Sequence, residues 1–271
     1  MKLDSPPHPP KTPPLPPRWR KPPFTMWLGI GILLAFFLHG LWISDLTPER
    51  IYKGFFRLGD FLAEAFPPKP DRLSNVIKAT IETFEMALVG TVFGAFLSLP
   101  LSLLAAKNTS PNRGIYSLSR GFITLLRVIP DLVWGLLFIV VVGLGVGAGI
   151  LAITVDVMGF CGKFFAERIE EIDPKPVEAL RALGASEWGI IVGAIFPATM
   201  PSFVASTLYS LEASVRSAVV LGLVGAGGIG VELATSMQLL RYDEALMTII
   251  VIFVVVLLVE QVSAVVRKAL M

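Results

Sequence analysis

Four ionisable side chains lie inside long apolar stretches and recur at a helical spacing. Arg127 and Asp131 are four residues apart in one stretch, and Glu212 and Arg216 are four residues apart in another. A charge in the centre of a membrane costs about 2.5–3.5 kcal/mol on the insertion scale, so each one needs a partner or a task. Two interpretations fit these pairs. In the first, the two charges of each pair neutralise each other and hold helices together. In the second, Arg127 or Arg216 faces a translocation path and briefly attracts an oxyanion.

A glycine-rich stretch follows the second pair. Gly225, Gly227, Gly228 and Gly230 satisfy the GxGxxG spacing of dinucleotide-binding loops. That fingerprint works only within a βαβ unit, whereas here an apolar run of membrane-crossing length follows from Ala245. We therefore expect these glycines to allow close backbone packing or to act as a hinge.

The sequence offers little for metal or redox chemistry. It holds one cysteine, Cys161, and two histidines, His8 and His39. An intrachain disulfide and a multi-thiolate metal site are excluded, and few zinc ligands remain. The phosphate-binding signature GxxxxGK[ST] is absent from the sequence. We expect no catalytic residue and no cofactor in this chain, and any ATP hydrolysis must come from another polypeptide.

Composition narrows the class of protein further. The 271 residues are 54% hydrophobic and only 16% charged, with a net charge of +2. Soluble domains carry about 25% charged residues, so this chain has too few to cover a surface in water. A net charge of +2 gives no field that would attract nucleic acid. These values exclude a cytosolic enzyme, a disordered regulator and a nucleic-acid-binding protein, and they indicate a polytopic protein of the lipid bilayer.

We predict an all-α fold with about six transmembrane helices. Residues 1–25 are proline-rich, which predicts an extended tail that serves as a solvated spacer or, less commonly, as a docking site for a proline-recognition module. Residues 26–44 form the first crossing, residues 45–75 an external loop with an amphipathic helix near 52–66, and residues 76–271 the core. The further crossings are predicted at residues 75–106, 123–151, 150–165, 188–223 and 245–266.

Orientation follows from the basic residues in the loops. With the N-terminus inside, the inner segments hold about twice as many lysines and arginines as the outer ones. This asymmetry predicts that both termini and residues 166–187 lie in the cytoplasm.

The cytoplasmic segment is built like two short helices that meet at a bend. Asp173 is a predicted N-cap with Pro174 in the first turn, Gly184 ends the helix in a left-handed conformation, and Ser186 caps the next helix. Such a rigid pair suits docking in a groove of another protein, although a plain surface loop would read similarly. Val177, Leu180 and Leu183 are expected to lie on one face of the first helix. Pro197 and Pro201 are expected to begin or kink the membrane helix that follows.

This segment resembles the EAA loop of permease subunits of binding-protein-dependent ABC importers. The family pattern is Glu-Ala-Ala, three residues, Gly, nine residues, Ile, one residue, Leu and Pro. Glu178, Ala179, Gly184 and Pro197 match it in type and spacing. Three positions depart from the pattern and stay apolar: Leu180, Ala194 and Phe196.

Four further stretches narrow the resemblance. Residues 127–131, 159–170, 209–217 and 220–230 are similar to phosphonate-type permeases and their phosphite-importing relatives, and the likeness runs from about residue 75 to the end. It implies a type I ABC-importer permease fold, a homodimeric pore in the bacterial plasma (inner) membrane and a coupling loop at 167–188. It also implies ATPase subunits that bind ATP and magnesium, and an external solute-binding protein that delivers a phosphonate or phosphite anion.

The mechanism that this resemblance implies is alternating access, in which closure of the ATPases moves the coupling helices and opens the membrane helices outward. Three alternatives stay open. One is an ABC permease for another small solute, such as an amino acid, a metal chelate, phosphate or another oxyanion. Another is a secondary transporter, which would call for internal repeats that the sequence does not show. The third is a membrane-bound oxidoreductase that uses the GxGxxG stretch.

Overall fold

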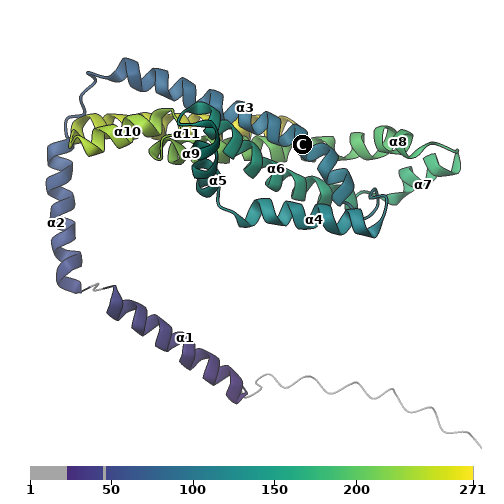
Figure 1. Ribbon diagram of the computed structural model, residues 1–271, viewed down its shortest axis with the longest axis horizontal. Helices are drawn as coiled ribbons and strands as arrows, with labels where there is room; N and C mark the ends of the chain where they lie inside the picture. Colours follow the sequence, from purple (N-terminus) through teal and green to yellow (C-terminus); the bar gives the residue numbers. More distant parts are fainter. Residues whose placement is uncertain (1–22, 45–46, 271) are drawn as a thin grey trace, which may run out of the picture. The chain divides into compact units, whose positions relative to one another are not determined.

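In the computed structural model, which describes residues 23–44 and 47–270, every regular element is a helix (Figure 1). The predicted all-α fold is therefore confirmed. The chain divides into two compact units, Met1–Asp60 and Phe61–Met271, which are described separately. Residues 1–22 of the predicted proline-rich tail lie outside the described residues, so the tail stays a prediction.

The first unit holds α1 (Phe24–Ile43) and most of α2 (Pro48–Ala65). Helix α1 carries no charged residue and is long and apolar enough to cross a membrane. Helix α2 is of a different kind, because charged residues recur along its whole length. The two helices therefore belong to different environments, and α2 does not continue the membrane span of α1.

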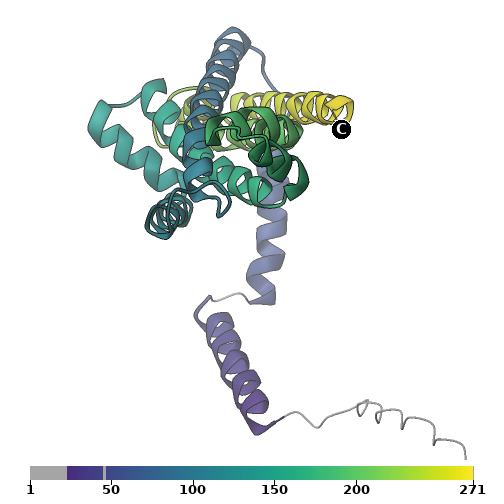
Figure 2. The same ribbon diagram turned by 90° about the vertical axis from the view of Figure 1, so that its right-hand side faces the viewer.

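The second unit is a helical bundle built around α6, which contacts α3, α4, α5 and α9. Its buried core includes Met86, Ile153, Val157 and Phe165. Figure 1 shows α7 and α8 at one end of this unit and α10 at the other end, and in Figure 2 the end with α7 and α8 faces the viewer. Its elements are α3 (Leu73–Ala105), α4 (Arg113–Val128), α5 (Asp131–Val142), α6 (Val146–Glu170), α7 (Pro174–Ala182), α8 (Glu187–Ile190), the π-helix η1 (Ile191–Ile195), α9 (Phe196–Leu223), α10 (Ile229–Gln238) and α11 (Tyr242–Leu270).

Within the described residues, five helices are long and apolar enough to cross a membrane, and a sixth span exists if α4 and α5 count as one broken span. The expectation of one continuous crossing over residues 123–151 was wrong, because α4 and α5 meet at an angle of 90°. The cause is Pro130, which lacks a backbone N–H and disfavours helical geometry at the residue before it. Ile129 is accordingly extended, with φ −84° and ψ 120°.

The second helix of the segment that was predicted to be cytoplasmic is not short, which corrects another expectation. Helix α8, the π-helix Ile191–Ile195 and α9 follow each other without interruption and form one membrane-span candidate, Glu187–Leu223, of 37 residues. The wider π-turn ends two residues before Pro197 and accommodates a residue that cannot donate a backbone hydrogen bond. Glu187 is therefore the first residue of a helix that continues into a membrane-span candidate.

Small and polar side chains hold the spans together. Gly90 and Gly94 bring α3 close to α6, because a Cβ at Gly94 would lie 2.7 Å from the carbonyl oxygen of Thr154. Helix α9 joins α3 through a hydrogen bond from Thr91 Oγ1 to Ser214 Oγ at 2.9 Å. Lipid tails are as apolar as leucine, so close packing and buried hydrogen bonds drive such contacts.

Candidate functional site

The α7 helix is defined by local capping, as its sequence predicts. The side chain of Asp173 accepts a hydrogen bond from the backbone N–H of Lys175 at 3.1 Å, and Pro174 occupies the first helical position. Proline fits there because the first N–H groups of a helix have no partner within the helix. The beginning of α7 therefore depends on neighbouring residues alone.

Gly184 makes the bend after α7. Its φ of +77° lies in the left-handed region, where other residues are strained. The N–H of Gly184 donates to the carbonyl of Arg181 at 3.0 Å, and the N–H of Ala185 donates to the carbonyl of Leu180 at 3.1 Å. This pair of bonds is a Schellman motif, the ordinary way in which a glycine ends a helix.

The second arm of the bend is capped as predicted. Ser186 Oγ accepts a hydrogen bond from the N–H of Gly189 at 3.2 Å, and Glu187 lies in the first turn, where the helix dipole favours a carboxylate. Arg181 Nη2 lies 3.6 Å from Glu187 Oε1, so an ion pair crosses the bend. The two arms are thus connected by backbone and side-chain contacts.

The apolar side chains of this segment divide into two groups. Val177 and Leu180 pack against the core of the bundle. Leu183 and Trp188 are 83% and 71% exposed. The expected single face of Val177, Leu180 and Leu183 was wrong at its last member, because the helix ends at Ala182 and its spacing no longer applies. We call residues 183–188, most of which are exposed, the coupling tip, after the role that the resemblance to the EAA loop implies.

The remaining motif residues lie around the coupling tip or beyond it. Glu178, Ala179 and Gly184 are exposed to the surroundings. Pro197 is also exposed, but it lies in the first turn of α9, past the π-helix, rather than at the bend. The motif therefore consists of a surface part and a part within the long helix.

Glu212 holds two arginines in the apolar part of the bundle. Arg216 Nη1 lies 2.9 Å from Glu212 Oε1, as the spacing predicts, and Arg267 Nη1 lies 3.5 Å from Glu212 Oε2. Glu212 is only 8% exposed. One carboxylate thus meets two cations, one from its own helix α9 and one from α11.

Sequence reasoning missed Arg267 as a partner of Glu212. No local signal could have found it, because the contact joins residues 55 positions apart and depends on how α11 crosses α9. The Nη1 atom of Arg267 is buried and makes no hydrogen bond within the described part of the chain.

Arg127 and Asp131 do not form the second expected pair. They belong to different helices, since α4 ends at Val128 and α5 begins at Asp131. Asp131 Oδ1 accepts a hydrogen bond from the N–H of Leu132 at 2.8 Å, at the positive end of α5. Arg127 is exposed and has no ion pair with any described residue. Their spacing of four residues therefore does not place them on one face of a helix.

The glycine-rich stretch joins α9 to α10 by a tight loop, with helices on both sides. Gly225, Gly227 and Gly228 have φ of +100°, +88° and +74°. A Cβ on Gly230 would run into the carbonyl oxygen of Val219, and a Cβ on Gly222 would lie 2.8 Å from Gly230 Cα. These contacts fit the expected close packing, and the hinge stays a prediction.

Helix α3 holds this glycine loop from the other side. The N–H of Gly228 donates to Glu82 Oε2 at 3.2 Å, and the N–H of Ile229 donates to Thr83 Oγ1 at 2.8 Å. The same end of the bundle is tied by two further cations, because Lys69 Nζ lies 2.6 Å from Asp243 and Arg72 pairs with Glu232 and Glu244. The hydrogen bond to Asp243 and its charge raise the pKa of Lys69 above its ordinary value.

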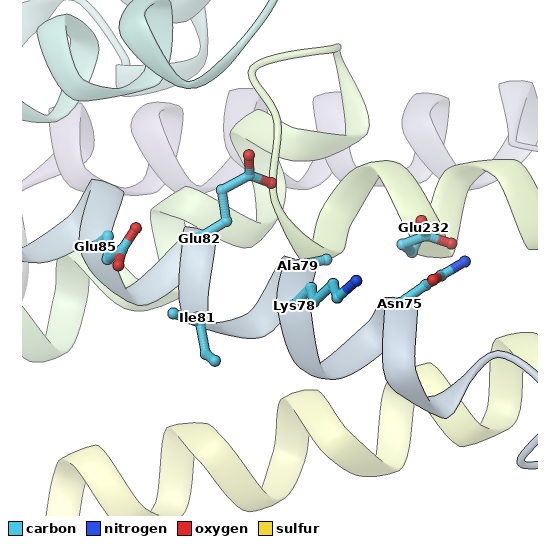
Figure 3. Close-up of a pocket in the computed structure, with 7 residues that line it drawn as sticks. All are labelled: Asn75, Lys78, Ala79, Ile81, Glu82, Glu85 and Glu232. Atoms are coloured by element: carbon cyan, nitrogen blue, oxygen red, sulfur yellow. The ribbon is translucent and has the colours of Figure 1, made fainter.

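A cavity of about 430 Å³ opens beside the loop (Figure 3). Glu82, Glu85 and Lys78 project into this region from α3, and Glu232 projects from α10. Three carboxylates face one amine, so the field here disfavours an anion. The cavity is lined by Asn75, Lys78, Ala79, Ile81, Glu82, Glu85 and Glu232.

Residues 98–270, most of the second unit, match the family described as the binding-protein-dependent transport system inner membrane component. The chain belongs to this family. Over 232 residues it is 37% identical to the putative phosphite transport system permease protein HtxC of Stutzerimonas stutzeri, covering 86% of this chain and 82% of HtxC. It is 36% identical over 240 residues to the phosphite transport system permease protein PtxC of the same organism, covering 88% and 87%.

Another relative of this permease carries a different substrate in its name. The phosphate-import permease protein PhnE of Mycolicibacterium smegmatis is 34% identical over 241 residues, which cover 89% of this chain but 45% of PhnE. The permease is thus similar to phosphite and phosphate permeases over most of its length.

Solved structures show the same fold. The permease matches an inward-facing MetNI methionine ABC transporter with a TM-score of 0.66 and 22% identity, covering 75% of this chain and 99% of that chain. A bacterial ABC transporter that imports alginate matches with a TM-score of 0.59 and 18% identity, covering 88% and 95%. The fold is that of a type I ABC-importer permease, and the protein is a multi-pass inner-membrane transport subunit.

Proposed function

We propose that this permease, as a pair of identical copies, forms the translocation path for a phosphonate or phosphite anion delivered by an external binding protein. Two ATPase subunits supply the energy and receive the coupling tip in a surface groove. The names of the phosphite-type relatives support the substrate class. The geometry of the segment 173–188 supports the coupling.

The observation that carries the coupling proposal is the continuity of the coupling tip with the membrane. Trp188 is exposed, yet it belongs to the 37-residue helix Glu187–Leu223 that also carries Glu212. The other arm is anchored, because Val177 and Leu180 pack on the core. A groove that grips the tip and moves it therefore moves the helix on which Glu212 and Arg216 lie.

We propose the following cycle of alternating access. ATP binding closes the ATPases, which carry the coupling tips inward and open the membrane helices to the outside. The binding protein then releases its anion into the path. ATP hydrolysis reverses the motion and exposes the anion to the cytoplasm. This orientation places both termini and the coupling tip in the cytoplasm.

Arg216 is the residue that we propose meets the anion. Its side chain is 46% exposed, and it shares Glu212 with Arg267, so the group carries one more positive than negative charge. A fully free arginine would hold an oxyanion tightly and trap it. An arginine that is partly neutralised by a carboxylate attracts the anion and also releases it.

The coupling is tested in proteoliposomes that hold the permease, its ATPase and the loaded binding protein. We expect Glu178→Lys and Gly184→Asp to abolish substrate-stimulated ATPase activity while the complex stays folded. Leu183→Ser should reduce stimulation, whereas Leu239→Ser, an exposed leucine at the opposite end of the bundle, should not. Wild-type stimulation in both Glu178→Lys and Gly184→Asp would contradict the proposal.

The substrate is tested by uptake in the same vesicles. Binding affinities of the partner binding protein are measured first for phosphite, methylphosphonate, phosphate and methionine, and uptake of the tightest ligand follows. We expect phosphite or methylphosphonate to be the best ligand. A preference for phosphate or for methionine would replace the substrate class and leave the coupling proposal in place.

A further inference from the structure

We propose that α2 lies flat on the surface of the lipid bilayer, with its apolar face inserted between the lipids. This goes beyond the proposed transport function and holds for any cargo. The occupant of the apolar face is the lipid itself, not another protein. The inference rests on the charge pattern of the helix, its exposed apolar face, the balance of its charges, the position of its first end and the position of its last end.

The charges of α2 are confined to one side. At about 100° per residue, its six charged side chains fall within an arc of about 100°. The opposite side is apolar and exposed in the structure. The charged residues are Glu49, Arg50, Lys53, Arg57, Asp60 and Glu64, and the large apolar ones on the other side are Ile51, Tyr52, Phe55, Leu58 and Leu62, while Phe56 lies at the edge of the charged arc, next to Glu49.

Such a division is the pattern of helices that lie in the membrane interface. Three of the six charges are acidic and three are basic, and Lys53 Nζ lies 2.7 Å from Glu49 Oε1 along the polar side. The polar side therefore offers no net charge to a charged partner, and the apolar side provides the attraction. A bilayer accepts a long apolar strip without needing a matching groove.

The first end of α2 is held near the membrane by α1. Helix α1 is a membrane-span candidate that ends at Ile43, and α2 begins at Pro48. The four intervening residues reach at most about 14 Å. Thr47 Oγ1 accepts a hydrogen bond from the N–H of Arg50 at 3.3 Å, which starts the helix at this point. The helix therefore begins close to where the first span leaves the lipid.

The last end of α2 is held at the entry of another span. The ring of Phe61 lies 4.9 Å from the ring of Tyr242, and Ala65 is fully buried. Tyr242 is the first residue of α11, whose uninterrupted apolar run starts after Glu244. Tyrosine is enriched where spans meet water, so this contact marks the interface.

Both ends thus lie at one surface of the bilayer, since the charged segment between α1 and α3 has no second crossing. An 18-residue helix is about 27 Å long. Standing upright, it would carry one of its ends that far from the surface, beyond what both attachments allow. It therefore lies along the surface, and the apolar side faces the lipid because the polar side must face water.

The inference is tested by spin labels on the full-length permease in a phosphatidylcholine bilayer. Single cysteines replace Phe55 on the apolar side and Arg57 on the polar side, in a Cys161→Ser background. Accessibility to oxygen, which enters lipid, is compared with accessibility to a water-soluble nickel chelate. We expect the Phe55 label to be accessible to oxygen and protected from nickel, and the Arg57 label to show the reverse order.

Two results would overturn the inference. Equal access of nickel to both labels would place the apolar side in water. Protection of the Phe55 label from both reagents would mean that a protein, such as a second copy, covers this side. The experiment is repeated with Cys161 retained and a short labelling time, so that the label reacts with the introduced cysteine rather than with the buried Cys161. The comparison then does not depend on the Cys161→Ser background.

Discussion

Arg267 Nη1 lies 3.5 Å from Glu212 Oε2, which joins the last turns of α11 to the membrane part of α9. The other carboxylate oxygen of Glu212, Oε1, lies 2.9 Å from Arg216 Nη1. The C-terminal helix is therefore attached, through one carboxylate, to the same long helix that reaches the coupling tip. A motion of α9 relative to α11 would change the distance between Glu212 and Arg267, and a change in the separation of two buried opposite charges is costly.

Glu212→Gln should destabilise the permease, because it leaves two arginines without a counter-charge in the membrane. Removal of one partner of a buried ion pair costs about 3–5 kcal/mol, and we expect a loss of about 3 kcal/mol. The measurement is unfolding of the purified permease in mixed micelles by titration with a denaturing detergent. Arg267→Gln is the matched control and should cost less, since Arg216 still neutralises Glu212. Equal stability of Glu212→Gln and the unmodified protein would show that the carboxylate is not needed.

Arg216→Gln should keep the fold and slow transport. Its side chain is half-exposed, and Glu212 keeps Arg267 as its partner. We expect uptake at low anion concentration to fall roughly tenfold, which corresponds to about 1.4 kcal/mol of lost attraction. Arg216→Lys should restore part of the rate because it retains the charge. Unchanged uptake in Arg216→Gln would remove Arg216 from the path and leave it as a structural residue.

Gly230→Ala should destabilise the loop between α9 and α10. The added methyl group would collide with the carbonyl oxygen of Val219, and backbone atoms cannot move aside cheaply. Overpacking of this kind costs about 1–3 kcal/mol. Gly147→Ala is the control, since nothing lies within 4 Å of its Cβ and its φ is ordinary. The same detergent titration should show no loss for Gly147→Ala, and no loss for Gly230→Ala either would contradict the packing argument.

The orientation is tested by labelling single cysteines in intact cells with a maleimide that cannot cross membranes. Ser74 opens α3 at one end of the bundle, and Glu171 follows α6 at the other. In a Cys161→Ser background we expect Ser74→Cys to react directly and Glu171→Cys to react only after the membrane is permeabilised. The opposite order would place the coupling tip outside and would be incompatible with cytoplasmic ATPases.

Much of the coupling segment was predictable from short-range chemistry. Asp173, Gly184 and Ser186 each act on backbone groups within a few residues, so their roles follow from residue type and order alone. The same holds for the apolar spans and for the ion pair between Glu212 and Arg216, which lie four apart on one helix. These features need no knowledge of how helices are arranged.

The arrangement of the helices decided the rest. The spacing of Arg127 and Asp131 equals that of Glu212 and Arg216, yet Pro130 separates the first pair into two helices at 90°. The sequence spacing places Leu183 on the same face of α7 as Val177 and Leu180, but the helix ends at Ala182 and the side chain of Leu183 is exposed.

The contacts of Arg267 with Glu212 and of Thr83 with Ile229 join segments 55 and 146 positions apart. They depend on the tilt and depth of whole helices, which are set by the packing of small residues such as Gly90 and Gly94 rather than by any nearby signal. The helix caps and the apolar spans follow from the sequence alone, because they depend on residues close together in the chain. Which charged side chains of different helices contact one another is decided only by the packing of the helices.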